Sequence, residues 1–228
     1  MARLFHFPLD PFCRRIRLSL GEYGREAALV EERPWEGRPE FLDRNPAGFL
    51  PIFEDDDGTS AVGIEAVGEY LDETRRAHLR SLYGSTPAER AETRRLVAWF
   101  DQKFHGEVSA PLIAEKVVRR HLPREAGGGP PDMAPVRRAL AAIRAHLNYI
   151  GFLADSRNWL AGGELSAADL AAAAHLSAVD YLGDVPWEEN ADAKAWYQRI
   201  KSRPAFRPLL ADQIRGVSPP PAYADLDF

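Results

Sequence analysis

The spacing of apolar residues changes once along this 228-residue chain. Over about the first 80 residues, short apolar runs of strand length alternate with stretches of helical spacing. From Pro87 onward, apolar residues recur every three or four positions, which is the interval of one helix face. The pattern predicts an α/β N-terminal domain followed by an all-α C-terminal domain.

The first part is predicted to run strand, helix, strand, then strand, strand, helix. Pro51 lies in an apolar run and has no amide hydrogen to donate to a sheet, so it must stand at a sheet edge or at the start of a strand. A cis peptide bond before Pro51 would be a specific feature of the fold and not a chance event. We expect strands at 3–7, at 28–32, in the run containing Pro51 and around Ile64. Helices are expected at 16–23, ending at Gly24, and from Ala66 to about Ala77. The segment 33–44 is expected to be a loop with a short helical piece at Trp35.

Glycine and proline clusters set the predicted boundaries: a sheet domain at 1–80, a linker at 81–86, a helical domain at 87–217 and a Pro-rich tail at 218–228. Proline is favoured in the first turn of a helix, which suits Pro87. Two core stripes are expected, one of Val97, Phe100, Phe104 and Val108, kinked by Pro111, and one of Val136, Leu140, Ile143, Leu147 and Ile150.

A helix start is predicted at Ser166. Ser166 and Asp169 have the spacing of a capping box, in an acidic version, and Leu165 and Leu170 occupy the positions of a hydrophobic staple.

The stretch from Asn45 to Leu71 resembles the glutathione-binding half of the thioredoxin-like domain in glutathione S-transferases. The Gly162-Gly163 turn before the Ser166 box and the run 203–206 are similar to later motifs of that family, so the resemblance covers roughly residues 3–210. It implies the complete transferase fold, a thioredoxin-like domain joined to an all-helical one.

The resemblance also implies a glutathione site. In the family, the residue before the cis-proline, here Leu50, offers its backbone to the cysteinyl part of glutathione. A Glu/Gln-Ser pair then holds the γ-glutamyl end. In this chain the pair is Glu65-Ala66, so the serine hydroxyl is missing.

A second departure concerns the thiol. Many bacterial transferases place a Ser or Cys at the start of the first helix, followed by Pro and an aromatic residue; this chain has Asp10, Pro11 and Phe12. Two like charges about 4 Å apart repel by ~4 kcal/mol at an effective dielectric near 20. A helix dipole returns only ~1 kcal/mol. We therefore predict no catalytic residue and no cofactor, with weak glutathione binding as the alternative. The vestigial site is predicted to comprise Asp10, Phe12, Leu50, Pro51, Glu65 and Ala66.

Asp10 also has a purely structural interpretation. Asp is a favoured N-cap and Pro11 suits the first helical position. Cys13 lies one turn into the helix rather than at the first position of a redox motif, so we predict a packed, inert thiol.

Charge and composition exclude several functions. The formal net charge of −5 argues against non-specific nucleic-acid binding. A single cysteine excludes an internal disulfide framework and fits a reducing cytoplasm. No apolar run has the length of a membrane span and no apolar leader opens the chain. The acidic run 54–58 does not have the ligand spacing of an EF-hand, so no metal site is predicted.

The tail after Gly216 combines three consecutive prolines with alternating acidic and apolar residues. The prolines favour an extended segment. It is predicted either to strap onto its own domain or to bind a partner. The partner-binding interpretation names Tyr223, Asp225, Leu226, Asp227 and Phe228.

Taken together, the Asp10 slot, Glu65-Ala66 and the tail resemble a cell-division subgroup of the family in alphaproteobacteria, which binds the tubulin-like GTPase FtsZ. That resemblance implies a cytoplasmic homodimer at the division site that binds FtsZ filaments, regulates constriction and has little transferase activity. Contacts of the tail with other division proteins are a further expectation. Two alternatives remain open: an active glutathione S-transferase, and a stress-type relative that binds another protein such as a polymerase.

The pairs Arg94-Arg95 and Arg119-Arg120 form either solvated faces or a surface for an acidic partner.

Overall fold

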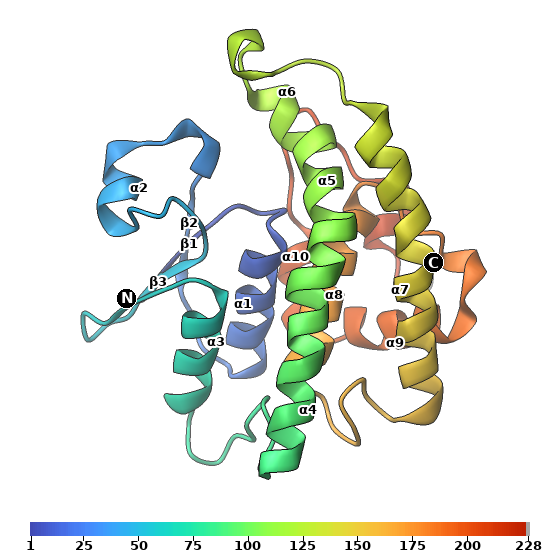
Figure 1. The fold of residues 1–228 in the computed structure, drawn as a ribbon. Coiled ribbons are helices and arrows are strands. Elements are labelled where there is room, and N and C mark those ends of the chain that lie inside the picture. The colour runs from blue at the N-terminus through green and yellow to red at the C-terminus, as the bar shows by residue number, and fades with distance from the viewer. Residues whose placement is uncertain (227–228) are drawn as a thin grey trace.

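A four-stranded sheet forms the core of the N-terminal domain in the computed structural model, which describes residues 1–226 (Figure 1). The strands are β1 (Arg3–His6), β2 (Ala28–Glu31), β3 (Ile52–Glu54) and β4 (Ser60–Val62), in the order β2-β1-β3-β4. β1 and β2 are parallel and the other two pairings are antiparallel. This arrangement confirms the predicted order of strands.

Two helices cover the face of the sheet that meets the helical domain, α1 (Pro11–Glu22) and α3 (Ile64–Glu73) (Figure 1). α1 begins after Asp10 and is followed by Gly24, whose φ of 58° is the left-handed conformation predicted for it. The bond before Pro51 is cis, and Pro51 directly precedes β3, so it stands at a strand start.

The sequence analysis was wrong on two points in this domain: it expected a strand around Ile64, and it expected loop where α2 lies. Ile64 is not in a strand but is the first residue of α3, because Gly63 takes a φ of 88° and turns the chain into the helix. The expected helical piece at Trp35 is present as the 3-10 helix η1 (Pro34–Glu36), and a second helix, α2 (Pro39–Arg44), follows it.

One long helical rod links the two ends of the C-terminal domain (Figure 1). It consists of α4 (Pro87–Ala98), η2 (Trp99–Ser109), α5 (Ala110–Ile113), η3 (Ala114–Val118) and α6 (Arg119–His121), where η2 and η3 have the wide turns of a π-helix. Pro111 does not kink the rod sharply. The wide turns accommodate it instead, and the Ala110 amide bonds to the His105 carbonyl.

The centre of the helical domain is α8 (Ala167–Tyr181), all of whose residues are buried. Around it lie α7 (Met133–Ser156), α9 (Ala191–Lys201), α10 (Arg207–Leu210) and four short 3-10 helices: η4 (Arg124–Ala126), η5 (Trp187–Glu189), η6 (Pro204–Phe206) and η7 (Pro221–Ala224). The predicted stripes on the rod and on α7 are in the core, with only Leu140 partly exposed.

Asp169 holds the start of α8. Its carboxylate accepts hydrogen bonds from the Ser166 amide at 3.0 Å and the Ser166 hydroxyl at 2.8 Å. It also accepts from the Leu160 amide at 2.9 Å and from the Trp196 indole at 3.1 Å. The predicted partnership of Ser166 and Asp169 is therefore present, and two distant segments share it.

Candidate functional site

Asp10 caps helix α1. Its side chain accepts a hydrogen bond from the Cys13 amide at 2.8 Å, and Pro11 occupies the first turn, as predicted. Burial raises the pKa of Asp10, although the Cys13 amide and the nearby His175 oppose that rise. In this structure the Asp10 side chain therefore serves as the cap of the helix.

Cys13 is fully buried. Burial and the neighbouring Asp10 charge both raise the pKa of its thiol, so the thiolate is strongly disfavoured. The predicted packing of the thiol is confirmed, and its inertness stays a prediction.

A cavity of about 610 Å³ lies between α3 and the α4–η2 segment of the rod. Phe12, Glu65 and Ala66 are among its lining residues. Leu50 and Pro51 are buried and do not line this cavity, and neither does Asp10. The structure thus brings half of the predicted vestigial site to one cavity.

The charges around this cavity are largely paired. Arg94 makes hydrogen bonds of 2.8 to 3.0 Å to Glu69, and Arg15 forms an ion pair with Asp101 and donates to Tyr83 at 3.0 Å. Glu65 is exposed and has no hydrogen-bond or ion-pair partner within residues 1–226. It is therefore the carboxylate left available in the cavity.

A buried polar chain behind Phe12 escaped the sequence analysis. Asp101 lies 3.3 Å from His175 Nε2, His175 Nδ1 lies 2.9 Å from Ser109 Oγ, and Ser109 Oγ lies 3.2 Å from His105 Nδ1. The Phe12 ring packs against both histidines, with centroid distances of 4.6 Å to His105 and 5.6 Å to His175. The spacing of Asp101, His105 and Ser109 along one helix face is a signal that could have revealed part of it.

The electrostatics of this chain follow from its burial. Burial and the nearby His175 lower the pKa of His105 to about 4, so its ring is neutral at pH 7. Burial alone would raise the pKa of Asp101, but Arg15 and His175 outweigh it, and the net pKa is lowered. The polar groups satisfy one another, which is the arrangement expected of a structural network.

The tail is held on its own domain as far as Ala224. Tyr223 is only 1% exposed, accepts a hydrogen bond from Arg14 at 2.9 Å and donates to the Leu209 carbonyl at 3.0 Å. Tyr223 therefore anchors the tail on its own domain, which is one of the two alternatives in the sequence analysis. In this structure its side chain is not available to a partner. Asp225 is exposed and Leu226 partly exposed, whereas Asp227 and Phe228 lie outside the described residues.

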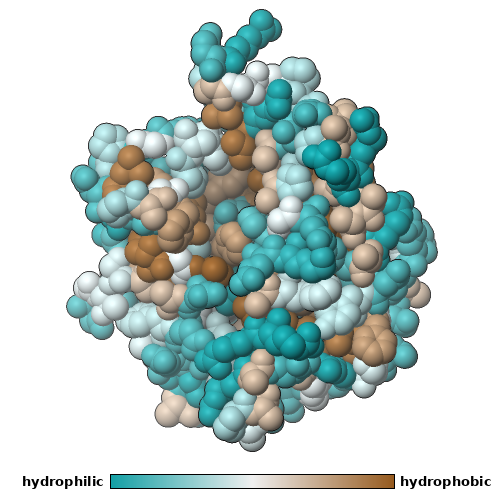
Figure 2. Space-filling model, viewed as in Figure 1, coloured by the Kyte–Doolittle hydropathy of each residue, from teal (hydrophilic) through white to brown (hydrophobic). Residues whose placement is uncertain are grey.

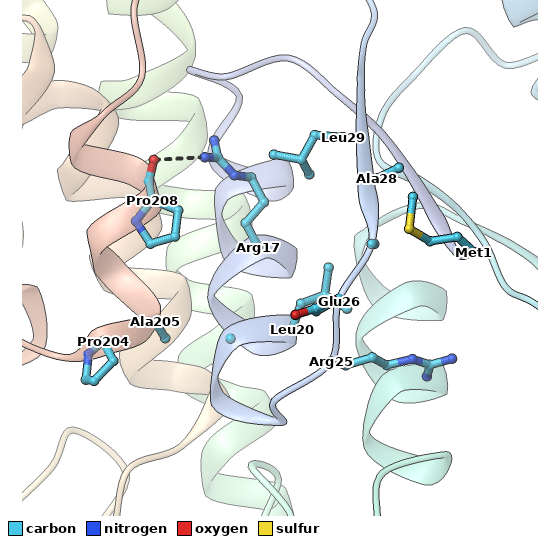
Figure 3. Close-up of a pocket in the computed structure, with 12 residues that line it drawn as sticks. Met1, Arg17, Leu20, Arg25, Glu26, Ala28, Leu29, Pro204, Ala205 and Pro208 are labelled. Carbon is cyan, nitrogen blue, oxygen red and sulfur yellow. Dashed lines mark hydrogen bonds between the residues drawn. The ribbon is translucent and has the colours of Figure 1, made fainter.

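A second cavity, of about 460 Å³, lies beside the outer strand β2 (Figure 3). Leu20, Leu29, Pro204 and Ala205 are among its mainly apolar lining, and Arg17 donates to the Pro208 carbonyl at 3.1 Å at its edge. None of the predicted site residues up to Leu226 lines it.

Across residues 1–226 no helix is long and apolar enough to cross a membrane. In the same part of the chain, no group of three or more His, Cys, Asp or Glu side chains is arranged to hold a metal ion.

The thioredoxin-like sheet, the start of α1 and the helical domain define the class of this protein. Residues 4–78 match the family model of the glutathione S-transferase N-terminal domain, and residues 111–204 match that of the C-terminal domain. The chain belongs to the glutathione S-transferase family.

Particular relatives are similar over nearly the whole chain. The chain is 46% identical to FtsZ-localized protein A of Caulobacter vibrioides, over 99% of this chain and 97% of the relative. The solved structure of FzlA from C. crescentus matches with a TM-score of 0.94 and 46% identity, covering 100% and 99% of the two chains. A glutathione S-transferase from Sinorhizobium meliloti matches with a TM-score of 0.96 and 48% identity, covering all of both chains.

We expect glutathione to bind this protein weakly or not at all, because Asp10 and Ala66 remove two polar contacts of the family's site. Isothermal titration should show no heat of binding at micromolar glutathione. Asp10→Ser alone should restore little transferase activity, since position 66 still lacks a hydroxyl. Micromolar affinity in the unmodified protein would contradict this expectation.

Proposed function

We propose that this protein is a non-catalytic member of the glutathione S-transferase family that associates with FtsZ filaments at the division site and regulates constriction. The observation that carries the proposal is the 46% identity, over nearly the full length of both chains, to a protein named FtsZ-localized protein A. The capping role of Asp10 and the Glu65-Ala66 pair support the absence of transferase chemistry.

The second candidate is an active glutathione S-transferase. The S. meliloti relative carries that name, and the cavity beside α3 retains the unpaired carboxylate of Glu65. In this alternative, backbone groups or water replace the missing hydroxyl.

Co-sedimentation with FtsZ filaments separates these candidates. The purified protein should pellet with polymerised FtsZ and remain in the supernatant when the nucleotide is GDP. In parallel, it should pass through glutathione-agarose and show no conjugation of chlorodinitrobenzene. If the protein does not pellet with FtsZ but does conjugate chlorodinitrobenzene, the enzyme is favoured. If it neither pellets with FtsZ nor conjugates chlorodinitrobenzene, an interaction with some other protein is favoured.

The proposal includes a homodimer, because the subgroup that the chain resembles is dimeric. Sedimentation equilibrium should give twice the mass of the 25.4 kDa chain. A monomer at micromolar concentration would remove this part of the proposal without affecting the filament assay.

We expect the last four residues to serve partner binding rather than folding. Deleting residues 225–228 leaves the Tyr223 anchor in place, so the melting temperature should stay within about 2 °C, while complementation of a division defect should fail. FtsZ co-sedimentation should survive if the globular body makes that contact.

The matched control is Tyr223→Ala, which removes the anchor itself. It leaves a cavity where a fully buried aromatic side chain packed, so it should cost about 3–5 kcal/mol. Full complementation by the truncated chain would show that residues 225–228 have no role in division.

A further inference from the structure

The upper end of the cleft between the two domains gathers cations from three separate segments. The Trp35 ring stacks on His121, so the segment that carries Arg33 meets the end of α6 here. Burial and the positive charges of Arg33 and Arg215 lower the pKa of His121. Arg120 donates to the Gly216 carbonyl at 3.2 Å and so lies beside Arg215. Arg33 comes from the segment before η1, Arg120 and His121 from the end of α6, and Arg215 from the loop after α10.

Two of these cations lack a carboxylate. Arg33 is shared between Glu31 and Glu36. In contrast, Arg120 and Arg215 are exposed, and neither forms an ion pair with any residue from 1 to 226. Like charges held together without counter-charges cost free energy, and an acidic ligand would relieve that cost.

Aromatic and apolar surface adjoins the cluster. The Trp35 ring stacks on His121 across the two domains, with centroids 6.0 Å apart and planes inclined by 22°. The Phe7 ring meets Trp35 edge-on, with centroids 4.9 Å apart. The Trp35 indole N–H has no hydrogen-bond partner among residues 1–226. Figure 2 shows a hollow between the α2 side of the molecule and α5–α6, with hydrophobic surface on both walls.

We propose that this end of the cleft binds an acidic segment of another protein in which carboxylates alternate with aromatic or aliphatic side chains. The guanidinium groups of Arg120 and Arg215 take the carboxylates, since arginine presents paired donors to them. The Trp35–His121 stack and the apolar walls take the side chains between. The complementary charges make association fast and dependent on salt. This proposed binding site is independent of the proposed function, because its chemistry does not require the partner to be FtsZ.

The test uses the full chain and a fluorescein-labelled heptapeptide, Gly-Asp-Leu-Asp-Phe-Asp-Gly, followed by fluorescence anisotropy at 50 mM salt. Saturable binding is expected, and raising the salt to 200 mM should weaken it at least threefold. The peptide with Asn in place of each Asp should bind at least tenfold more weakly. Equal binding of the two peptides would overturn the proposal, as would the absence of saturable binding.

Two variants localise the site. Arg120→Glu with Arg215→Glu should weaken binding at least tenfold. The matched control is Arg137→Glu with Arg138→Glu, which makes the same change of charge at two exposed arginines of α7 and should weaken binding less than twofold. Equal losses in both variants would mean that only net charge matters and would overturn the site.

Trp35→Phe supplies an independent readout. Peptide binding should change the tryptophan emission of the unmodified protein, and that change should be lost in the variant while anisotropy still reports binding. Thermal melts of all variants within about 3 °C of the unmodified protein confirm that the fold is intact. An emission change that persists in Trp35→Phe would place the peptide elsewhere and contradict the proposal.

Discussion

Replacing Asp169 with alanine is expected to lower the free energy of unfolding by about 4 kcal/mol or more. The carboxylate accepts four hydrogen bonds, and its donors on Leu160, Ser166 and Trp196 are all buried. A buried donor left without an acceptor costs about 1–3 kcal/mol. For a chain of this size the melting temperature should fall by roughly 8–16 °C.

A matched control separates this network from helix-end electrostatics. Asp192 lies in the first turn of α9, is exposed and forms no side-chain hydrogen bond or ion pair with any residue from 1 to 226, so Asp192→Ala should cost less than about 1 kcal/mol. Ser166→Ala should be milder than Asp169→Ala, and the double variant should lose less than the sum of the two. Equal melting temperatures for Asp169→Ala and Asp192→Ala would show that the network contributes little.

The elements that could be predicted from sequence are those specified by neighbouring residues. Gly24, Pro87 and the Ser166–Asp169 pair mark helix ends through local backbone chemistry, and the stripe on α7 marks its buried face through periodicity. The same local chemistry identified Asp10 as a cap. The strand error at Ile64 was also local, because Gly63 turns the chain into the helix at Ile64, two residues before the start expected at Ala66.

The contacts that could not be predicted join residues far apart in the chain. The Arg15–Asp101 pair, the two histidines behind Phe12 and the Trp35–His121 stack each need both domains in place. Tyr223 is the clearest case. An aromatic residue in a Pro-rich tail fits a partner's pocket and its own domain equally well, and only the position of Arg14 decides between them.

Helix α1 connects the two domains through its arginines. Its arginines point into the helical domain, where Arg14, Arg15 and Arg17 meet acidic partners. The helix is therefore a bridge between the sheet, the rod and the tail.

The corresponding prediction is that Arg14→Met destabilises the protein by about 3–5 kcal/mol, the cost of removing one partner from a buried charge network. Arg14 is fully buried and donates to the Pro8 carbonyl at 2.7 Å, Ser177 at 3.0 Å, Tyr223 at 2.9 Å and Asp212 at 3.0 Å. Methionine has similar length and no donor. Thermal melts should show a fall of roughly 6–20 °C.

The loss should also loosen the tail, which distinguishes the network from simple packing. Asp212 keeps its bonds to Arg17, but the Tyr223 hydroxyl loses its donor and retains only its bond to Leu209. Limited proteolysis should therefore cut the tail of Arg14→Met sooner than that of Arg138→Met, an exposed arginine on α7. Tyr223→Phe should reproduce part of this, at about 1 kcal/mol. A melting temperature for Arg14→Met within 2 °C of the unmodified protein would show that the tail and α1 are held by packing rather than by this guanidinium.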